Sequence, residues 1–430
     1  MPFSIRRHTS LPGGHMTRKI IVLIGLVLLV GCSGGGGDEA PPSSPSANNP
    51  TPAKPTEFLI ATPSGLWRGL PNGQGGIVFA QSNFIQQDLS FSGSHVFYER
   101  LKGPNTGTPL DDTDIWTVKP DGTGNRAAVD TTAPEHLRGS AGPWMVYIKL
   151  LFDSGNIDQQ LWSLHDTGAQ HLLYEENMGV AVQFHGTDRV LFMTDRIISS
   201  NTLTGTDHVI HASIPLTDGD TFMAGMRVAG NHLIFLQEYG AGGAVFRILT
   251  VPLAGGTSTP LESDQFNSYV VGTLGSRVIY HRCAPAALCD VASIEADGTN
   301  RVVLASHPAN EAVQGVTTSQ VIIRRNLAVN DQLVAVPVAG GPEKPLMTMT
   351  DNEFVEAMVG DTIIIRRPTG TWTLDLNGNL KQIGTKPGLD FFRVVGDSIC
   401  SDFGEIWCLP IDGSRAEVRI DRNGKFLGVL

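Results

Sequence analysis

The sequence lacks the signals of a helical protein. No stretch after residue 57 shows a 3.6-residue apolar period, which argues against helical bundles and helical solenoids. Aromatic residues make up only 7% of the chain and charged residues 17%, yet 41% of residues are apolar, so a sizeable core is available and wholesale disorder is excluded. The 49 glycines and 26 prolines favour many short strands joined by turns.

The motifs of common catalytic sites are also missing. There is no G-x-S-x-G, no P-loop, no H-E-x-x-H and no zinc-type cysteine–histidine spacing. We interpret His208 and His211, which a strand would place on opposite faces, as two half-exposed histidines. Asp111, Asp112 and Asp114 lack a calcium-loop frame, so a solvated loop is favoured over a bound calcium ion. We therefore predict no catalytic residue, no metal site and no cofactor.

Residues 1–31 are typical of a signal peptide. Arg18 and Lys19 precede an apolar run of 11 residues, 20–30, which is too short to span a bilayer as a helix. The run ends in Leu-Val-Gly-Cys at Cys32, which resembles the lipobox of bacterial lipoproteins. The resemblance implies cleavage before Cys32 and a covalent lipid, such as palmitate, on that residue. A plain signal peptide with an accidental cysteine is the alternative.

A tether is predicted between this anchor and the folded domain. Residues 32–57 contain almost no bulky apolar side chain and are rich in Gly, Ser, Pro and Asn. Ser33 stands where the lipoprotein resemblance would place Asp for inner-membrane retention. We therefore expect a lipid-anchored protein of the bacterial outer membrane, facing the periplasm or the cell surface.

The charge of the chain restricts its partners. Met16 is the expected start, and removal of the leader with its four basic residues would change the formal charge from −11 to −15, with 27 basic against 42 acidic residues. A protein this acidic is a poor general binder of nucleic acid or of anionic lipid surfaces. Any anion site must therefore be local, and we expect a monomer.

One phrase is repeated along the chain: an apolar strand, a turn rich in Gly, Asp or Asn, and a second strand. Five of the six tryptophans occupy the same place in its first strand. The copies are LWRGLPNGQGGIVF, IWTVKPDGTGNRAAV, LWSLHDTGAQHLL, ILTVPLAGGTSTPL, VASIEADGTNRVVL, LVAVPVAGGPEKPL, TWTLDLNGNLKQI and IWCLPIDGSRAEV, with VIHASIPLTDGDTF at Val209 as a looser ninth. A second hairpin, marked by a turn glycine, lies between copies. The period of about 43 residues and four strands per unit predict an all-β protein, a single β-propeller, over residues 58–430.

The repeats resemble those of TolB-like bacterial propellers, in which a strand, an Asp-Gly turn and a short outer strand recur. They depart from TolB in the inner hairpin, where shorter Gly turns replace the W-S-P-D-G phrase. The family's strand order implies that FLIAT at the start and KFLGVL at the end of the domain share a blade, so that strands from both termini close the ring. A literal count gives nine blades, but we expect eight, with one unit degenerate.

Four cysteines remain besides Cys32, and they allow three pairings. Each near pair flanks the connection between the second and third strands of a unit. Because antiparallel neighbours bring such residues within disulfide reach, we predict Cys283–Cys289 and Cys400–Cys408. Four free buried thiols are the alternative, which an oxidising compartment disfavours.

Three successive second strands end in basic residues. They place His281, Arg282, Arg324, Arg325, Arg366 and Arg367 at equivalent positions of neighbouring units, with Arg100 and Arg196 at similar places elsewhere. Two interpretations remain open. The residues are ordinary strand-end charges paired with nearby acids, or they form an anion site for an acidic glycan or an acidic partner surface on one face.

Two classes of function follow from the sequence. The first is a non-catalytic binding or scaffold module tethered in the envelope. The second is an enzyme, such as a metal-dependent sugar lyase or a hydrolase, because some propellers similar to this one are lyases. A lyase needs histidines and carboxylates that converge near the axis, and the repeats show none at matching positions. We therefore favour binding, although fold alone does not fix function.

Overall fold

The computed structural model divides the chain into two units, residues 1–53 and 54–430. The structure describes residues 57–429 of the second unit, apart from 63–64, 81–83, 93–94, 103–111, 154–155, 177–180, 195–196, 214–221, 240–244, 263–266, 284–288, 308–309, 328, 387–391 and 402. The predicted leader, Cys32, nearly all of the tether, Asp111 and Arg196 lie outside these residues. The described part contains 35 strands and no helix, and hence no helix that is long and apolar enough to cross a membrane.

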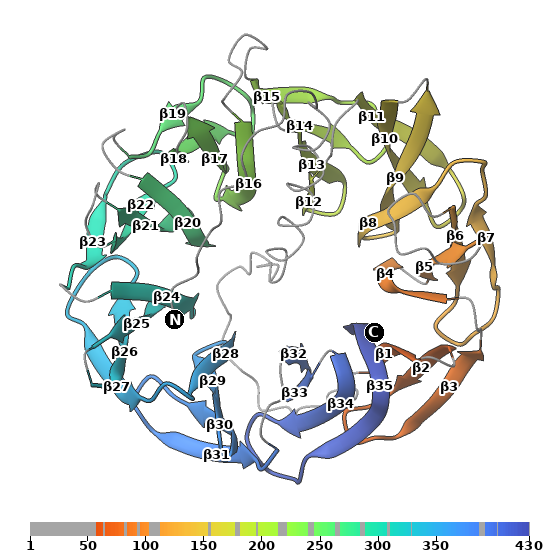
Figure 1. The fold of residues 1–430 in the computed structure, drawn as a ribbon. Helices are drawn as coiled ribbons and strands as arrows, with labels where there is room; N and C mark the ends of the chain where they lie inside the picture. The colour runs from red at the N-terminus through yellow and green to blue at the C-terminus, as the bar shows by residue number, and fades with distance from the viewer. Residues whose placement is uncertain are drawn as a thin grey trace, which may run out of the picture. The chain divides into compact units, whose positions relative to one another are not determined.

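The strands form nine four-stranded antiparallel blades arranged in a ring (Figure 1). The innermost strands of eight blades are β4 (Phe84–Ser92), β8 (Glu135–Ala141), β12 (Ala181–His185), β16 (Phe222–Ala229), β20 (Asn267–Leu274), β24 (Asn310–Val316), β28 (Phe354–Val359) and β32 (Phe392–Val395). The second strands are β1 (Phe58–Thr62), β5 (His95–Leu101), β9 (Trp144–Asp153), β13 (Arg189–Met193), β17 (His232–Tyr239), β21 (Arg277–Cys283), β25 (Gln320–Asn326), β29 (Thr362–Arg367) and β33 (Ser398–Ser401).

Two outer layers complete the blades. The third strands are β2 (Gly65–Gly69), β6 (Thr113–Val118), β10 (Asn156–His165), β14 (Ile197–Thr202), β18 (Val245–Pro252), β22 (Cys289–Glu295), β26 (Asp331–Pro337), β30 (Gly370–Leu374) and β34 (Phe403–Pro410). The fourth strands are β3 (Gly75–Ala80), β7 (Arg126–Val129), β11 (Gln170–Glu176), β15 (Val209–Ser213), β19 (Thr259–Pro260), β23 (Val302–Ala305), β27 (Lys344–Met349), β31 (Leu380–Gly384) and the first part of β35 (Val418–Val429).

The long strand β35 explains the number of blades. Its first part pairs with β34, where Trp407 lies opposite Arg419, and its last part pairs with β1, where Leu59 lies opposite Gly428. One strand is thus the outer edge of one blade and the innermost strand of the next, which β1, β2 and β3 complete. The expectation of eight blades was wrong. The described strands form nine blades, which agrees with the literal repeat count.

The described disulfides lie within single blades. Cys283 on β21 is bonded to Cys289 on β22, and Cys400 on β33 is bonded to Cys408 on β34, with Cα–Cα separations of 4.0 and 4.1 Å. In both pairs the two cysteines are direct cross-strand partners. Each bridge therefore joins a second strand to a third strand.

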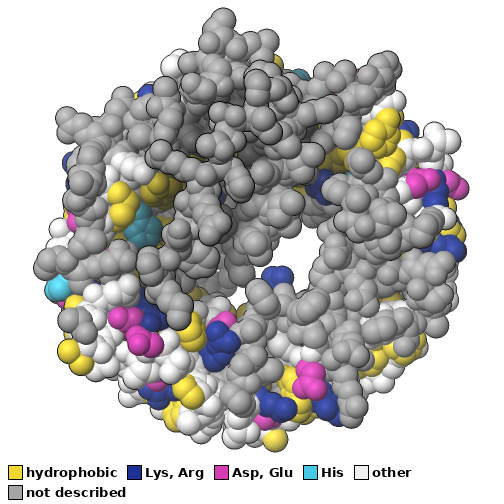
Figure 2. All heavy atoms as spheres, viewed as in Figure 1, with side chains coloured by type: hydrophobic (Ala, Val, Ile, Leu, Met, Phe, Trp, Pro, Cys, Tyr) yellow, Lys and Arg dark blue, Asp and Glu magenta, His cyan; other side chains and the backbone are white. Residues whose placement is uncertain are grey.

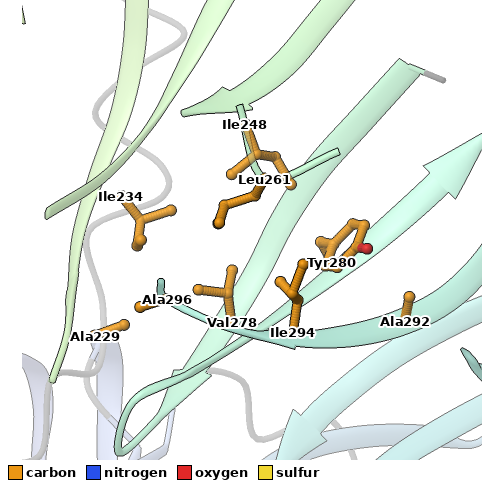
Figure 3. Packing of buried hydrophobic residues seen from close by; sticks show 9 residues of the cluster. All are labelled: Ala229, Ile234, Ile248, Leu261, Val278, Tyr280, Ala292, Ile294 and Ala296. Atoms are coloured by element: carbon orange, nitrogen blue, oxygen red, sulfur yellow. The ribbon is translucent and has the colours of Figure 1, made fainter. Parts of the chain in front are cut away.

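The apolar core lies between neighbouring blades, and one fourth-strand position contributes to it in every blade but one. We call the place of the repeated tryptophan in the third strand the tryptophan site. The position in question comes one residue after the fourth-strand partner of that site, and in most blades the pairing register shifts there. Figure 3 shows one example, Leu261, among Ile234, Val278 and Ile294 of two adjacent blades. We call it the bulge position, and its occupants are Val78, Ala128, Leu173, His211, Leu261, Leu304, Leu346, Ile383 and Ile420.

Blade β12–β15 departs from this pattern in its interior. The sequence interpretation placed a third strand at Val209, but residues Val209–Ser213 form the fourth strand β15 and the third strand is β14. The signal was hidden because Ser199 stands at the tryptophan site and Asn201 at a position that is Val, Leu or Ile in seven other blades. Ser199, Asn201 and His211 are at most 3% exposed.

Candidate functional site

The basic residues predicted at the ends of the second strands occupy equivalent ladder positions. His281, Arg324 and Arg366 face matching residues of β20, β24 and β28, and each is followed by an arginine. The five arginines are only partly exposed, with side-chain values from 6% to 25%. Burial lowers the pKa of His281 and favours its neutral form.

Each of these arginines contacts a carboxylate of the fold. Arg325, the most buried, lies 2.9 Å from Glu311 and 2.8 Å from Glu343. Its hydrogen bond lowers the pKa of Glu343, and the two acids raise the pKa of Arg325. The remaining pairs are Arg282–Glu262 at 2.9 Å, Arg366–Glu356 at 2.7 Å, Arg367–Glu353 at 2.5 Å and the closer pair Arg324–Asp331.

Some of these guanidinium groups also cover aromatic rings. The Cζ atom of Arg367 lies 5.1 Å from the ring centroid of Trp372, and Arg100 lies 4.3 Å from that of Trp116. Figure 2 shows Lys and Arg side chains beside Asp and Glu side chains over the blade β24–β27. The geometry matches strand-end charges paired with nearby acids, so any external anion must compete with these carboxylates.

The acidic run beside Asp111 surrounds a lysine rather than an empty site. Nζ of Lys102 lies 2.6 Å from Asp114, 3.6 Å from Asp112 and 3.5 Å from Asp130. Among the described residues, no group of three His, Cys, Asp or Glu side chains is arranged to hold a metal ion. Close by, burial raises the pKa of Glu135 to about 7, although the hydroxyl of Thr131 donates to its carboxylate.

A pocket of about 430 Å³ opens where blade β12–β15 meets blade β16–β19. We call this place the open junction, and its lining residues are His185, Arg189, Ser200, Asp207, Val209, Leu253 and Ala254. The first five come from β12–β15 and the last two from the turn after β18. Ligand pockets in proteins span roughly 300–1,000 Å³, so this one is large enough for a small molecule.

The polar side chains of the pocket form one chain of contacts. Nη1 of Arg189 donates to Ser200 Oγ at 2.9 Å, and Nη2 of Arg189 forms an ion pair with Asp207. Ser200 Oγ also lies 2.9 Å from Nε2 of His211, whose buried Nδ1 has no hydrogen-bond partner among the described residues. Burial, and to a smaller extent the charges of Arg189 and His208, lowers the pKa of His211. The imidazole is therefore neutral near pH 7.

The Ser200–His211 pair does not form a catalytic triad. A triad needs a carboxylate that accepts from the second ring nitrogen of the histidine. In the described part of the chain that nitrogen has no partner, and Asp207 is paired with Arg189. His211 is also not the half-exposed residue that strand alternation predicted, since it is 3% exposed. The register shift of this blade places His211 beside Ser200, as the equivalent shift places Leu173 against the next blade.

Three other junctions contain a hydrogen bond between blades that the described residues of the open junction lack. Ser163, Thr250 and Ser293 occupy the position of Ser200, and their hydroxyls donate to backbone carbonyls of the next blade at 2.5, 2.7 and 2.6 Å. The equivalent bond from Ser200 to the turn that carries Leu253 is not made. Arg277, the counterpart of Arg189, donates at 3.0 Å to the carbonyl of Val338, the counterpart of Leu253. At the open junction, the hydroxyl and the guanidinium bind within their own blade.

Comparisons with known proteins agree on fold alone. No family model matches the sequence, and no curated protein is significantly similar to it. The structure is similar to dipeptidyl peptidase 4 from Porphyromonas gingivalis, with a TM-score of 0.53 and 8% identity, over 78% of this chain and 58% of that one. The β-propeller domain of the trilobed protease from Pyrococcus furiosus has a TM-score of 0.41 and 9% identity, over 78% of this chain and 97% of that one. TolB from Acinetobacter baumannii has a TM-score of 0.28 and 14% identity, over 60% of this chain and 65% of that one. The ring of nine four-stranded blades itself defines the class, a β-propeller. This chain spans 58% of the dipeptidyl peptidase.

Proposed function

We propose that the chain is a lipid-anchored protein of the bacterial cell envelope whose propeller acts as a non-catalytic binding module. The open junction carries the proposal, because it combines a pocket of about 430 Å³ with fixed polar groups and an incomplete set of catalytic groups. Arg18, Lys19, the apolar run and Cys32 support the anchor, and the low-complexity tether would hold the propeller away from the membrane.

The anchor is tested by Cys32→Ser. The N-terminal peptide of the wild-type protein should carry acyl mass, and the variant should lack it and leave the membrane fraction. An unmodified N-terminal peptide in the wild-type protein would contradict the lipid anchor but would leave the description of the propeller fold unaffected.

The binding role is tested by heating the purified protein with fractionated envelope extract. A fraction that contains the ligand should raise the melting temperature in proportion to its dose, because a ligand that binds only the folded state stabilises it. The composition of that fraction should be unchanged after incubation. New products of defined mass would favour the enzyme alternative, and the absence of any stabilising fraction would contradict a binding role.

A further inference from the structure

The repeated blades act as internal controls for the open junction. Where blade β12–β15 buries Ser199, Asn201 and His211, the matching positions of the other blades are almost all apolar. In blade β16–β19 the bulge position is Leu261, which packs among apolar side chains (Figure 3). Burying polar atoms without partners is unfavourable, and Ser199 Oγ and His211 Nδ1 are both buried in that way. Asn201 donates at 3.1 Å to the carbonyl of Leu173 in the preceding blade, so of this set His211 is the one that contacts a pocket residue, Ser200.

The charges of the pocket are balanced. Arg189 and Asp207 are paired at its edge, with 24% and 57% of their side chains exposed. The guanidinium offers donors only and the carboxylate offers acceptors only. A carboxylate ligand would add a second negative charge beside Asp207, and a cationic ligand would add a second positive charge beside Arg189. The pair is therefore suited to a neutral ligand that carries a donor and an acceptor side by side.

The rest of the lining is apolar or weakly polar. Val209, Leu253 and Ala254 provide a hydrocarbon wall, and His185 adds a ring nitrogen that makes no hydrogen bond with another described residue. Adjacent hydroxyls on a ring with a C–H face match both parts of this surface, because each hydroxyl is donor and acceptor and the C–H face can cover the hydrocarbon wall. We propose that the open junction binds a neutral sugar ring, free or at the end of a glycan, through vicinal hydroxyls held by Arg189 and Asp207. This inference rests on the proposed binding function and deepens it.

The test uses the purified full-length protein and a panel of rings that differ in charge: glucose, galactose, mannose and N-acetylglucosamine, with glucuronate and galacturonate as charged counterparts. Saturation-transfer NMR and melting temperature report binding, and short neutral oligosaccharides separate a free sugar from a glycan end. Ala254→Leu should fill the pocket and abolish binding. Ala339→Leu changes the equivalent exposed alanine in blade β24–β27 and should leave binding intact. Asp207→Asn should weaken binding about tenfold or more, since hydrogen bonds to charged groups are the stronger ones.

Binding of a neutral ring by the wild type and Ala339→Leu, lost in Ala254→Leu, supports the proposal. Binding of uronates alone, or equal binding by Ala254→Leu, overturns it. If no sugar binds but envelope extract still raises the melting temperature of the wild type, the sugar assignment fails while the binding function stands. If neither sugar nor extract has an effect, both fail.

Discussion

Cys400 and Cys408 are direct cross-strand partners on β33 and β34, and their disulfide lies in the apolar layer beside β1, with both side chains at most 1% exposed. Cys283 and Cys289 are paired in the same way but are half-buried. The two bridges therefore have matched chain geometry and different surroundings.

Removing the buried bridge should destabilise the protein more. Closing such short loops contributes about 2–3 kcal/mol to the free energy of unfolding. Replacing Cys400 and Cys408 with Ala should also lose core packing, for a total of about 3–5 kcal/mol. The double substitution Cys283→Ala and Cys289→Ala should lower the free energy of unfolding by only the loop-closure contribution of about 2–3 kcal/mol. Urea unfolding compares the two, and equal losses would contradict the difference in burial.

Glu135 should make stability fall as the pH rises from about 4.5 to about 7. Its folded pKa of about 7 lies above its ordinary value of 4.5, so the folded state binds the extra proton between these values. The resulting stability is present below about pH 4.5 and is lost as pH rises through 7. Glu135→Gln should therefore be more stable than the wild type at pH 8.5, by on the order of 2 kcal/mol, and similar at low pH. The exposed substitution Glu175→Gln is the control and should leave the profile unchanged.

His211 should change the pH dependence of stability in the opposite direction to Glu135. Its pKa is lowered in the folded state, so the unfolded chain binds more protons, and stability is lost as pH falls below about 6.5. His211→Leu restores the residue type of the other bulge positions and should lose less stability between pH 7.5 and 5. Some acid sensitivity should remain, because burial also lowers the pKa of His281. The reciprocal change Leu261→His should add acid sensitivity at a junction that lacks it, and an unaltered pH profile in both variants would refute this role.

The arginines at the strand ends should matter for stability. If they were free surface charges, their replacement would leave the melting temperature almost unchanged. Arg325 is 5% exposed and paired with Glu311 and Glu343, so Arg325→Met should cost about 3 kcal/mol or more by leaving buried Glu311 without its partner. Arg415 forms an exposed ion pair with Asp397, in which Nη2 lies 3.8 Å from Oδ1. Arg415→Met should therefore change stability little. If Arg325→Met and Arg415→Met lowered the free energy of unfolding by equally small amounts, the buried ion pairs of Arg325 would not contribute to stability.

The sequence was sufficient to predict the architecture, because four-stranded units with a recurring tryptophan leave few other folds. It also predicted that KFLGVL forms an innermost strand, as the pairing of Gly428 with Leu59 shows. It failed at β14, where the polar Ser199 stands at a position that is tryptophan in five blades and Leu, Ala or Val in the other three. It also failed for His211, because alternation along a regular strand does not hold at a bulge.

The pocket could not be predicted for a different reason. Ser200 bonds within its own blade, whereas Ser163 and Ser293, of the same residue type at the same place, bond to the next blade, and residue type alone does not distinguish the two cases. A comparison of blades could have drawn attention to this region, since Asn201 and His211 interrupt two columns of apolar residues. That signal becomes visible only once the units are aligned strand by strand.

The central claim is that the propeller binds a ligand at the open junction, and native mass spectrometry of protein purified gently from the envelope tests it directly. The account predicts a non-covalent small-molecule adduct on the wild-type protein and on Ala339→Leu, and none on Ala254→Leu. An adduct of equal occupancy on all three proteins, or on none of them, would contradict the claim.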